Sequence, residues 1–319
     1  MSGTTPKLLR EATVEARSRY FDSARWSGYQ PRSDDMVIAT YPKCGTTWMQ
    51  RIVGMLVFQS ADPFPVQESS PWPDMRMPPP GAMLELAESQ AHRRFFKTHL
   101  PYDALTIYEG MKIIHVARDG RDAALSFHNH KLNYTDELIA TTTEISMADP
   151  KFGTPYLRTG PDPAVHFRNW VEGEADHVGD KKCGYFYMEN SYWAARHEPN
   201  LLMVHFADLK EGLEGEMRRI AEFLEIEVEE DLWPQLVEAA GFDAMKKRAA
   251  QLLPTADTIW QGGGNTFLHK GQNARWKGVY DQADLKKYDA KVADQFSPSL
   301  ARWTEQGRVE AGDPLELPD

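Results

Sequence analysis

The feature that most constrains the fold is an apolar run that stops at a short polar turn and is followed at once by a second apolar run. Residues 36–41 (MVIATY) have the length and composition of a buried strand. A turn that contains Pro42 and Gly45 follows, and residues 46–59 are apolar on nearly every side, as in a buried helix. A buried strand that leads directly into a buried helix predicts an α/β fold, because the helix must pack on the sheet that holds the strand.

Three more segments have the pattern of short strands, at residues 94–98, 112–117 and 201–206. Helical patterns lie between and after them; residues 211–224, for example, carry apolar side chains at spacings of four, three and four. Alternating strands and helices predict a central, mainly parallel β-sheet flanked by helices. Because no break in composition divides the chain, we expect one domain over residues 1–319, with the motifs between about 36 and 280.

Charge and composition exclude several classes of protein. The chain has 36 Lys and Arg against 47 Asp and Glu, a net charge of −11, which argues against a nucleic-acid partner. Two cysteines, Cys44 and Cys183, are too few for a disulfide framework, and no cluster at ligand spacing suggests a metal. Scattered charges near the N-terminus do not fit a signal peptide, and the apolar run 52–58 is far below the roughly 20 residues of a membrane span. These features predict a cytoplasmic protein without a membrane span.

A proline-rich stretch at residues 61–81, which includes Trp72, is incompatible with long regular elements. Such a length of irregular chain in a compact fold is often a functional loop or lid. A surface excursion that only covers the core is the alternative, and the sequence leaves both interpretations open.

The turn between the first strand and helix has the properties of an anion site. The unpaired N–H groups at a helix N-terminus point outward, and the helix dipole adds positive charge there. Gly45 allows close backbone approach, Thr46 and Thr47 add hydroxyl donors, and Lys43 adds a full charge. This P-loop-like phosphate site is not a Walker A motif, because Lys43 precedes the glycine. An ordinary strand–helix turn with a surface lysine is the alternative.

The whole octet at residues 41–48, Tyr-Pro-Lys-Cys-Gly-Thr-Thr-Trp, resembles the phosphosulfate loop of the cytosolic sulfotransferase family, which has serine in place of Cys44. Residues 96–101 (Phe-Lys-Thr-His-Leu-Pro), 117–126, 242–246 and 267–277 are similar to further segments of that family, in the same order. The resemblance covers most of the chain. It implies the sulfotransferase fold and transfer of a sulfuryl group from 3′-phosphoadenosine 5′-phosphosulfate (PAPS), without a metal.

Sulfuryl transfer requires a base for the acceptor and positive charge on the leaving oxygen. The resemblance gives the role of base to His99, whose ordinary pKa near 6.5 suits it. Lys43 is expected to stabilise the oxygen that leaves with the phosphate. Lys97, two residues before His99 on a strand, points to the same face and is placed to hold a sulfuryl oxygen or the acceptor.

Cofactor contacts implied by the resemblance involve Lys43, Cys44, Gly45, Thr46, Thr47, Trp48, Arg118, Ser126, Phe206, Phe242, Met245, Phe267, Leu268, His269, Lys270 and Gly271. Within this set, Arg118 and Ser126 are assigned to the 3′-phosphate, and Trp48 and Phe242 to the two faces of the adenine.

The chain departs from the family pattern at three cofactor positions. His269 stands in place of an arginine, Ala240 in place of a frequent threonine and Phe206 in place of a frequent tyrosine. Cys44, at a helix N-terminus, is open to two interpretations: an oxidisable thiol with a lowered pKa, or, more simply, a small residue in place of serine whose backbone N–H does the binding. His128 and His130 follow Ser126; one interpretation is that they face the acceptor, and the preferred one is that they have no role in the site.

Aromatic and proline-rich sequence around residues 63–80, with Tyr134 and Phe152, favours a small apolar or aromatic alcohol, phenol or amine as acceptor over a sugar polymer. A P-loop-like kinase or NTPase and a non-catalytic nucleotide-binding protein remain the alternatives. The displaced Lys43 and the arginine that follows residues 112–117 disfavour the first, and the presence of both Lys43 and His99 disfavours the second. The sequence does not decide the oligomeric state, and a homodimer stays open.

Overall fold

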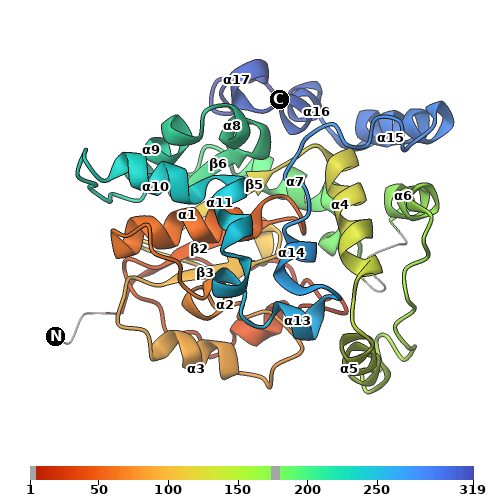
Figure 1. Ribbon diagram of the computed structural model, residues 1–319, viewed down its shortest axis with the longest axis horizontal. Helices are drawn as coiled ribbons and strands as arrows, with labels where there is room; N and C mark the ends of the chain where they lie inside the picture. Colours follow the sequence, from red (N-terminus) through yellow and green to blue (C-terminus); the bar gives the residue numbers. More distant parts are fainter. Residues whose placement is uncertain (1–4, 174–179) are drawn as a thin grey trace.

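The computed structural model describes residues 5–173 and 180–319. Its central sheet has four strands in the order β3-β2-β5-β6, and all three pairings are parallel (Figure 1). These strands are β2 (Met36–Thr40), β3 (Phe95–Thr98), β5 (Lys112–Ala117) and β6 (Leu201–His205). A small antiparallel pair joins β1 (Leu8–Arg10) to β4 (Ile107–Tyr108). The predicted α/β architecture with a mainly parallel sheet is confirmed.

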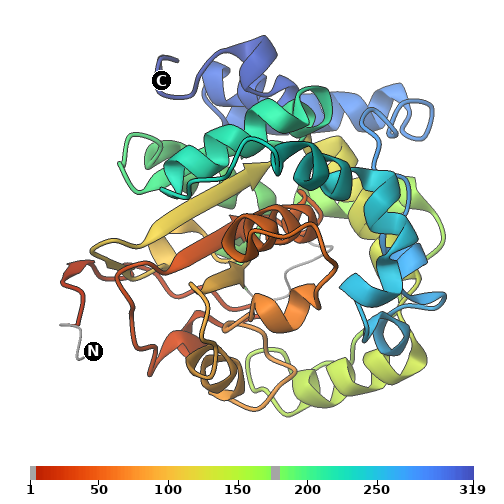
Figure 2. The same cartoon turned by 60° about the vertical axis from the view of Figure 1, so that its left-hand side comes forward.

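Helices surround the sheet (Figures 1 and 2). The α-helices are α1 (Thr46–Phe58), α2 (Val66–Ser69), α3 (Ala82–Glu88), α4 (Gly120–Leu132), α5 (Asp136–Met147), α6 (Pro163–Glu172), α7 (Tyr185–Ala194), α8 (Phe206–Glu211), α9 (Leu213–Phe223), α10 (Trp233–Ala240), α11 (Phe242–Lys247), α12 (Ala249–Leu252), α13 (Ala256–Ile259), α14 (Gly263–Phe267), α15 (Gln282–Gln295), α16 (Pro298–Gln306) and α17 (Arg308–Ala311). Short 3-10 turns occur at η1 (Ser23–Trp26), η2 (Tyr102–Ala104) and η3 (Lys181–Cys183).

Alternating strand residues build one hydrophobic cluster on each face of the sheet. Ile38 and Ile114 pack with α1, α9 and α10 on one face. Val37 and Ile113 pack with α4, α6, α7 and α16 on the other. Because both faces are covered, the strands are buried along nearly their whole length, which explains their continuous apolar sequence.

Three strand boundaries differ from the sequence prediction by one residue: β3 begins at Phe95, and β2 and β6 each end one residue early. β2 ends at Thr40 because the Tyr41 side chain turns into the core, where its hydroxyl accepts a hydrogen bond from Trp170 Nε1 at 2.7 Å. β6 ends at His205, since Phe206 already begins α8, and the His205 ring caps that helix by accepting from the Ala207 N–H.

The proline-rich stretch has little regular structure, as predicted, apart from the single turn of α2. Arginine side chains hold it in place through its backbone carbonyls. Arg51 on α1 donates to the carbonyls of Ala61 and Asp62, and Arg25 donates to those of Met75 and Pro78. The stretch is thereby fixed against the body of the protein.

Within the part of the chain that the structure describes, no helix is both long enough and apolar enough to cross a bilayer.

Candidate active site

A cavity of about 460 Å³ opens at the carboxyl ends of β2, β3 and β5. Lys43, His99 and Arg118 follow these three strands directly and all line it. The loops after the carboxyl ends of parallel strands are the usual location of ligand sites in α/β folds. Every residue predicted for catalysis or cofactor binding lines this one cavity except Cys44.

The turn before α1 has the backbone geometry of an open anion cradle. Gly45 is the N-cap residue of the helix, with φ of 111°, and it has no side chain to cap the first N–H groups. A Cβ at Gly45 would lie 3.1 Å from Phe206 Cδ2, so both conformation and space favour glycine. The Thr46 hydroxyl lies 2.6 Å from the Thr40 hydroxyl, which fixes its orientation. The first turn of α1 therefore presents backbone donors to the cavity.

Lys43 places its amine deep in the cavity. Nζ lies 4.0 Å above the centre of the Phe267 ring and 3.2 Å from Nδ1 of His130. Burial, aided by the positive charges of Lys97 and Arg118, lowers the pKa of Lys43 to about 7. A bound anion would reverse this effect, because it favours the charged amine.

His99 has the tautomer that a general base needs. Its Nδ1 lies 2.6 Å from the Thr40 carbonyl oxygen, which only accepts, so Nδ1 carries the hydrogen. The lone pair of the neutral ring is then on Nε2. The ring packs edge-on against Trp72, with centroids 4.9 Å apart.

Trp72 also contacts Lys97, whose Nζ lies 3.9 Å from the indole centre. Burial lowers the pKa of Lys97 to about 8, and the nearby carboxylate of Asp74 partly opposes this shift. Asp74 is itself fully buried and accepts hydrogen bonds from Trp72 Nε1 at 2.6 Å and from Trp26 Nε1 at 3.1 Å. Asp74 thus fixes the indole that positions both Lys97 and His99, a role that no motif in the sequence indicated.

Arg118 connects the cradle to the C-terminal part of the site. Its guanidinium donates to the carbonyls of Lys43, at 3.2 Å, and Gln272, at 2.9 Å, and lies 4.2 Å from the ring of Phe206. Asp122 accepts from the backbone N–H groups at positions 274 and 275, at 2.6 and 2.9 Å. These bonds hold the segment that carries Lys270 beside the first turn of α4.

Trp48 and Phe242, the two residues that the resemblance assigns to the adenine, both line the cavity. Trp48 Nε1 donates to the Ala240 carbonyl at 2.8 Å, so Ala240 contributes its backbone carbonyl to the site by orienting the indole. Gly271 has φ of 57°, and a Cβ there would come within 2.3 Å of Phe242 Cδ2. The glycine is therefore required by its contact with Phe242.

Apolar and aromatic side chains from segments that are far apart in sequence also line the cavity, and we call them its apolar wall. They are Tyr20, Phe21, Trp72, Met75, Met77, Met83, Leu86, Tyr134, Leu138, Ile259 and Trp260. Of the two residues predicted here, Tyr134 lines the cavity, whereas Phe152 packs under the guanidinium groups of Arg19 and Arg76 instead. The proline-rich stretch forms part of this wall.

The structure corrects the first interpretation of Cys44, that of a thiol with a lowered pKa. Its side chain is fully buried, and burial raises the pKa of the thiol well above its usual value, with the Glu189 carboxylate adding to the effect. The helix N-terminus does not outweigh this loss of solvent. Cys44 therefore acts as a small core residue under the cradle, and its thiol is not an activated nucleophile.

At His269, which replaces an arginine of the family pattern, burial and the neighbouring Arg275 and Lys270 lower the pKa. Its ring is therefore a neutral donor or acceptor at pH 7. Among the described residues that line the cavity, Glu68 alone is acidic, against Lys43, Lys97, Arg118, Lys210, Lys270 and Arg275. Residues 5–173 and 180–319 contain no group of three His, Cys, Asp or Glu that could hold a metal ion.

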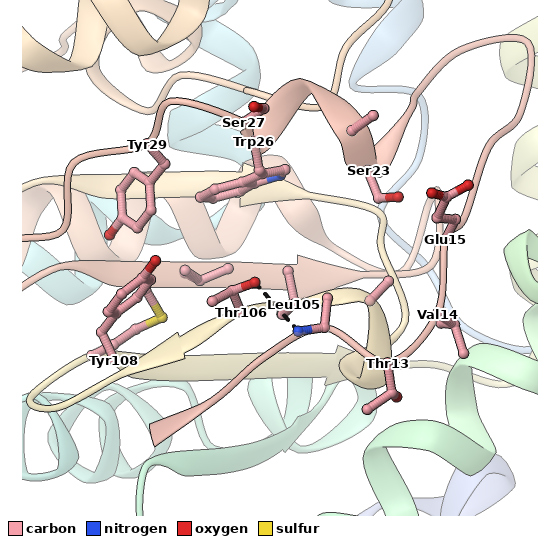
Figure 3. A pocket seen from close by; sticks show the side chains of 15 residues that line it. Thr13, Val14, Glu15, Ser23, Trp26, Ser27, Tyr29, Leu105, Thr106 and Tyr108 are labelled. Carbon is pink, nitrogen blue, oxygen red and sulfur yellow. Dashed lines mark hydrogen bonds between the residues drawn. The ribbon is translucent and has the colours of Figure 1, made fainter. Parts of the chain in front are cut away.

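A second cavity, of about 410 Å³, lies between the N-terminal segment and the residues around β4 (Figure 3). Trp26, Tyr29 and Tyr108 contribute rings to its wall. None of the predicted site residues lines it. Its relation to the first cavity is indirect, through the bond from Trp26 to Asp74.

Comparison with known proteins agrees with this geometry. Residues 33–299 match the sulfotransferase domain family. A glycolipid sulfotransferase of Mycobacterium bovis (strain BCG / Pasteur 1173P2) is 31% identical over 315 residues, which cover 92% of this chain and 95% of that protein. Sulfotransferase 1A1 of Rattus norvegicus is 27% identical over 272 residues, covering 82% and 84% of the two chains.

Two solved structures have the same fold. Mouse sulfotransferase SULT7A1 complexed with PAP superposes with a TM-score of 0.65 at 18% identity and covers 90% of both chains. Retinol dehydratase in a complex with retinol and PAP has a TM-score of 0.65 at 21% identity and covers 88% of both chains. The family match over most of the chain, together with the relative at 31% identity, establishes that this protein belongs to the sulfotransferase family and is a sulfotransferase enzyme.

Proposed function

We propose that this enzyme transfers the sulfuryl group of PAPS to a hydroxyl, or an amine, of a small apolar or aromatic acceptor. The observation that carries the proposal is the convergence of Lys43, Lys97 and His99 on one cavity, with His99 held by the Thr40 carbonyl in the tautomer of a base. We propose further that the chain acts as one domain and needs no metal.

The cofactor half of the proposal rests on the cradle and the cationic lining. The first turn of α1 offers backbone N–H groups to the phosphosulfate, and Arg118 and Ser126, with Lys270, suit the 3′-phosphate. Trp48 and Phe242 suit the adenine. PAP, the desulfated cofactor, is present in structures of two proteins that share this fold, which supports the choice of PAPS.

The acceptor half rests on the apolar wall that Met75, Met77, Leu138 and Trp260 contribute. An apolar body against that wall would place one hydroxyl beside His99. The names of two similar proteins are compatible with this class: a glycolipid sulfotransferase, and a retinol dehydratase crystallised with retinol.

The reaction balances with these groups alone. The acceptor oxygen attacks sulfur in line, and its proton passes to Nε2 of His99 as the new S–O bond forms. The bond from sulfur to the bridging oxygen breaks, and its electron pair stays on the phosphate of the leaving PAP. The ammonium of Lys43 stabilises that charge, and Lys97 holds a sulfuryl oxygen. The products are a sulfate ester, or a sulfamate from an amine, and PAP.

Thermal unfolding with three nucleotides tests the cofactor choice. PAP should raise the midpoint temperature of unfolding most, 5′-AMP less, and ATP with Mg²⁺ least. Neither 5′-AMP nor ATP has a 3′-phosphate for Arg118 to contact. A charge-assisted contact of this kind is worth roughly 1.5–3 kcal/mol. Stabilisation by ATP with Mg²⁺ that equals or exceeds that by PAP would refute the proposal and favour a kinase or NTPase.

A further inference from the structure

His130, on α4, lines the active-site cavity. Its ring is surrounded by those of Tyr134, Trp260 and Phe267, at centroid distances of 5.2, 5.0 and 5.7 Å. A histidine in such an aromatic enclosure loses most of its contact with water. A phenylalanine would fill the same space, so packing alone does not explain why this residue is a histidine.

The explanation is the contact with Lys43. Nδ1 of His130 lies 3.2 Å from Lys43 Nζ. A charged amine has only donors, so Nδ1 accepts from it, and the ring hydrogen is then on Nε2. This arrangement needs a neutral imidazole, because a protonated ring has no lone pair to offer.

The surroundings keep the ring neutral. Burial lowers the pKa of His130 well below its usual value, and the positive charges of Lys43 and Lys97 act in the same direction. His99 and Lys131 make smaller contributions of the same sign. The surroundings thus favour the neutral ring, whose Nδ1 can accept a hydrogen bond from Lys43.

For Lys43 this acceptor matters because the other groups that face its amine oppose its charge. Lys97 on β3 and Arg118 after β5 repel it, and burial removes its water. Among the described residues, Nδ1 of His130 and the face of the Phe267 ring make favourable contacts with Nζ. Together they use two of the directions around the ammonium and leave its remaining N–H for a ligand.

We propose that His130 is a positioning residue of this enzyme: its Nδ1 holds the Lys43 amine in place and favours its charged form, so that the lysine is ready to meet the leaving oxygen. The catalytic consequence rests on the proposed function, whereas the pairing itself can be tested without cofactor.

Two substitutions separate the hydrogen bond from the packing. His130→Phe fills the aromatic enclosure but removes the acceptor. His130→Asn places an amide oxygen near the position of Nδ1 and keeps it. The reaction of Lys43 with a small acylating reagent, followed by mass spectrometry across a range of pH in the ligand-free protein, reports the pKa of its amine. Lys286, exposed on α15, serves as the internal reference for reagent reactivity.

We expect His130→Phe to lower the pKa of Lys43 by about one unit, a tenfold change in its ionisation constant. His130→Asn should stay within about a third of a unit of the wild type. An unchanged pKa in His130→Phe would overturn the proposal, as would an equal shift in both variants. A thermal midpoint close to the wild type is the criterion that each variant is folded.

PAP affinity gives the second readout. Above pH 7, His130→Phe should bind PAP about tenfold more weakly than the wild type, and His130→Asn should recover most of the loss. Equal PAP affinity in all three proteins would contradict the positioning role. If the wild type itself does not bind PAP, the proposed function fails, while the acylation result still decides whether His130 supports the charge of Lys43.

Discussion

Lys43 and Lys97 occupy a cavity that removes water from both ammonium groups, and this is why each has a pKa below its usual value. Such residues are well suited to bind a polyanion. In the free protein their charges are costly, and a phosphosulfate would supply the missing counter-charge. The two amines therefore lack a counter-charge until an anion binds, and the pH dependence of anion binding can be predicted from their pKa values.

Removal of one amine tests the assigned role. Lys43→Ala should lower kcat by about 10² to 10³, because the leaving oxygen loses its charged partner in a site with little water. The steady-state rate of PAP formation is the measurement. A folded Lys43→Ala protein with near wild-type turnover would remove this lysine from the mechanism.

Binding of PAP should be coupled to proton uptake. Below pH 7 Lys43 is already charged, so its titration does not change the affinity for PAP. Above pH 7 the neutral amine of the free protein must gain a proton when PAP binds, and the affinity for PAP therefore falls as the pH rises. Lys97 adds the same effect above about pH 8. Calorimetry in buffers of different ionisation enthalpy measures the uptake. Proton release on binding, or affinity that increases from pH 7 to 9, would show that the amines do not meet the anion.

At the scale of elements, the strand–turn–helix unit of β2 and α1 positions the cradle. Gly45→Ala should destabilise the protein by roughly 1–2 kcal/mol through its positive φ and should also weaken PAP binding, because the new Cβ presses on Phe206. Gly81→Ala is the matched control, since Gly81 has φ of 86° but open space around its Cβ position. Chemical unfolding and PAP titration measure both effects. Equal PAP affinity in the two variants would mean that the cradle tolerates the side chain.

The sequence predicted this unit well because its information is local. A strand, a glycine turn and a helix follow one another within residues 36–59, and the motifs at residues 96–101 and 117–126 lie at the ends of strands whose carboxyl ends must meet at one edge of the sheet. The motifs at residues 242–246 and 267–277 lie among helices and were found through the resemblance alone. The acceptor wall could not be predicted in the same way. Tyr20, Met77 and Trp260 come together only through the path of irregular segments, and Phe152 faces Arg19 and Arg76 for the same reason. The pKa of the Cys44 thiol could not be predicted either, because it depends on burial, which a motif does not reveal.

At the scale of the whole molecule, a protein of net charge −11 has one cavity whose described lining carries six Lys and Arg side chains against one carboxylate. Field strength in a cleft depends on the groups that line it more than on the total charge, so an acidic exterior is compatible with an anionic ligand. On the proposed function, the lining of the cavity divides the work: its cationic side chains suit the nucleotide, and its apolar side chains suit the acceptor.

This division predicts separable defects. Met77→Glu places a charge in the apolar wall and should raise the KM for an apolar phenol at least about tenfold, because the acceptor must then bind next to a buried carboxylate, while PAP affinity changes little. Met147→Glu, on the exposed end of α5, is the control and should leave both constants unchanged. A Met77→Glu enzyme with weakened PAP binding and an unchanged acceptor KM would contradict the division.

The most direct test of the account measures sulfuryl transfer from radiolabelled PAPS to phenols of graded acidity, by the wild type and by His99→Ala. The wild type should sulfate weakly acidic phenols, and His99→Ala should lose about 10²- to 10⁴-fold of that rate while it still binds PAP. The deficit should shrink for a phenol that is already ionised at neutral pH, since it has no proton to give to Nε2 of His99. Absence of transfer by the wild type to any acceptor, or an equal deficit across the whole series in a mutant that binds PAP, would contradict the account.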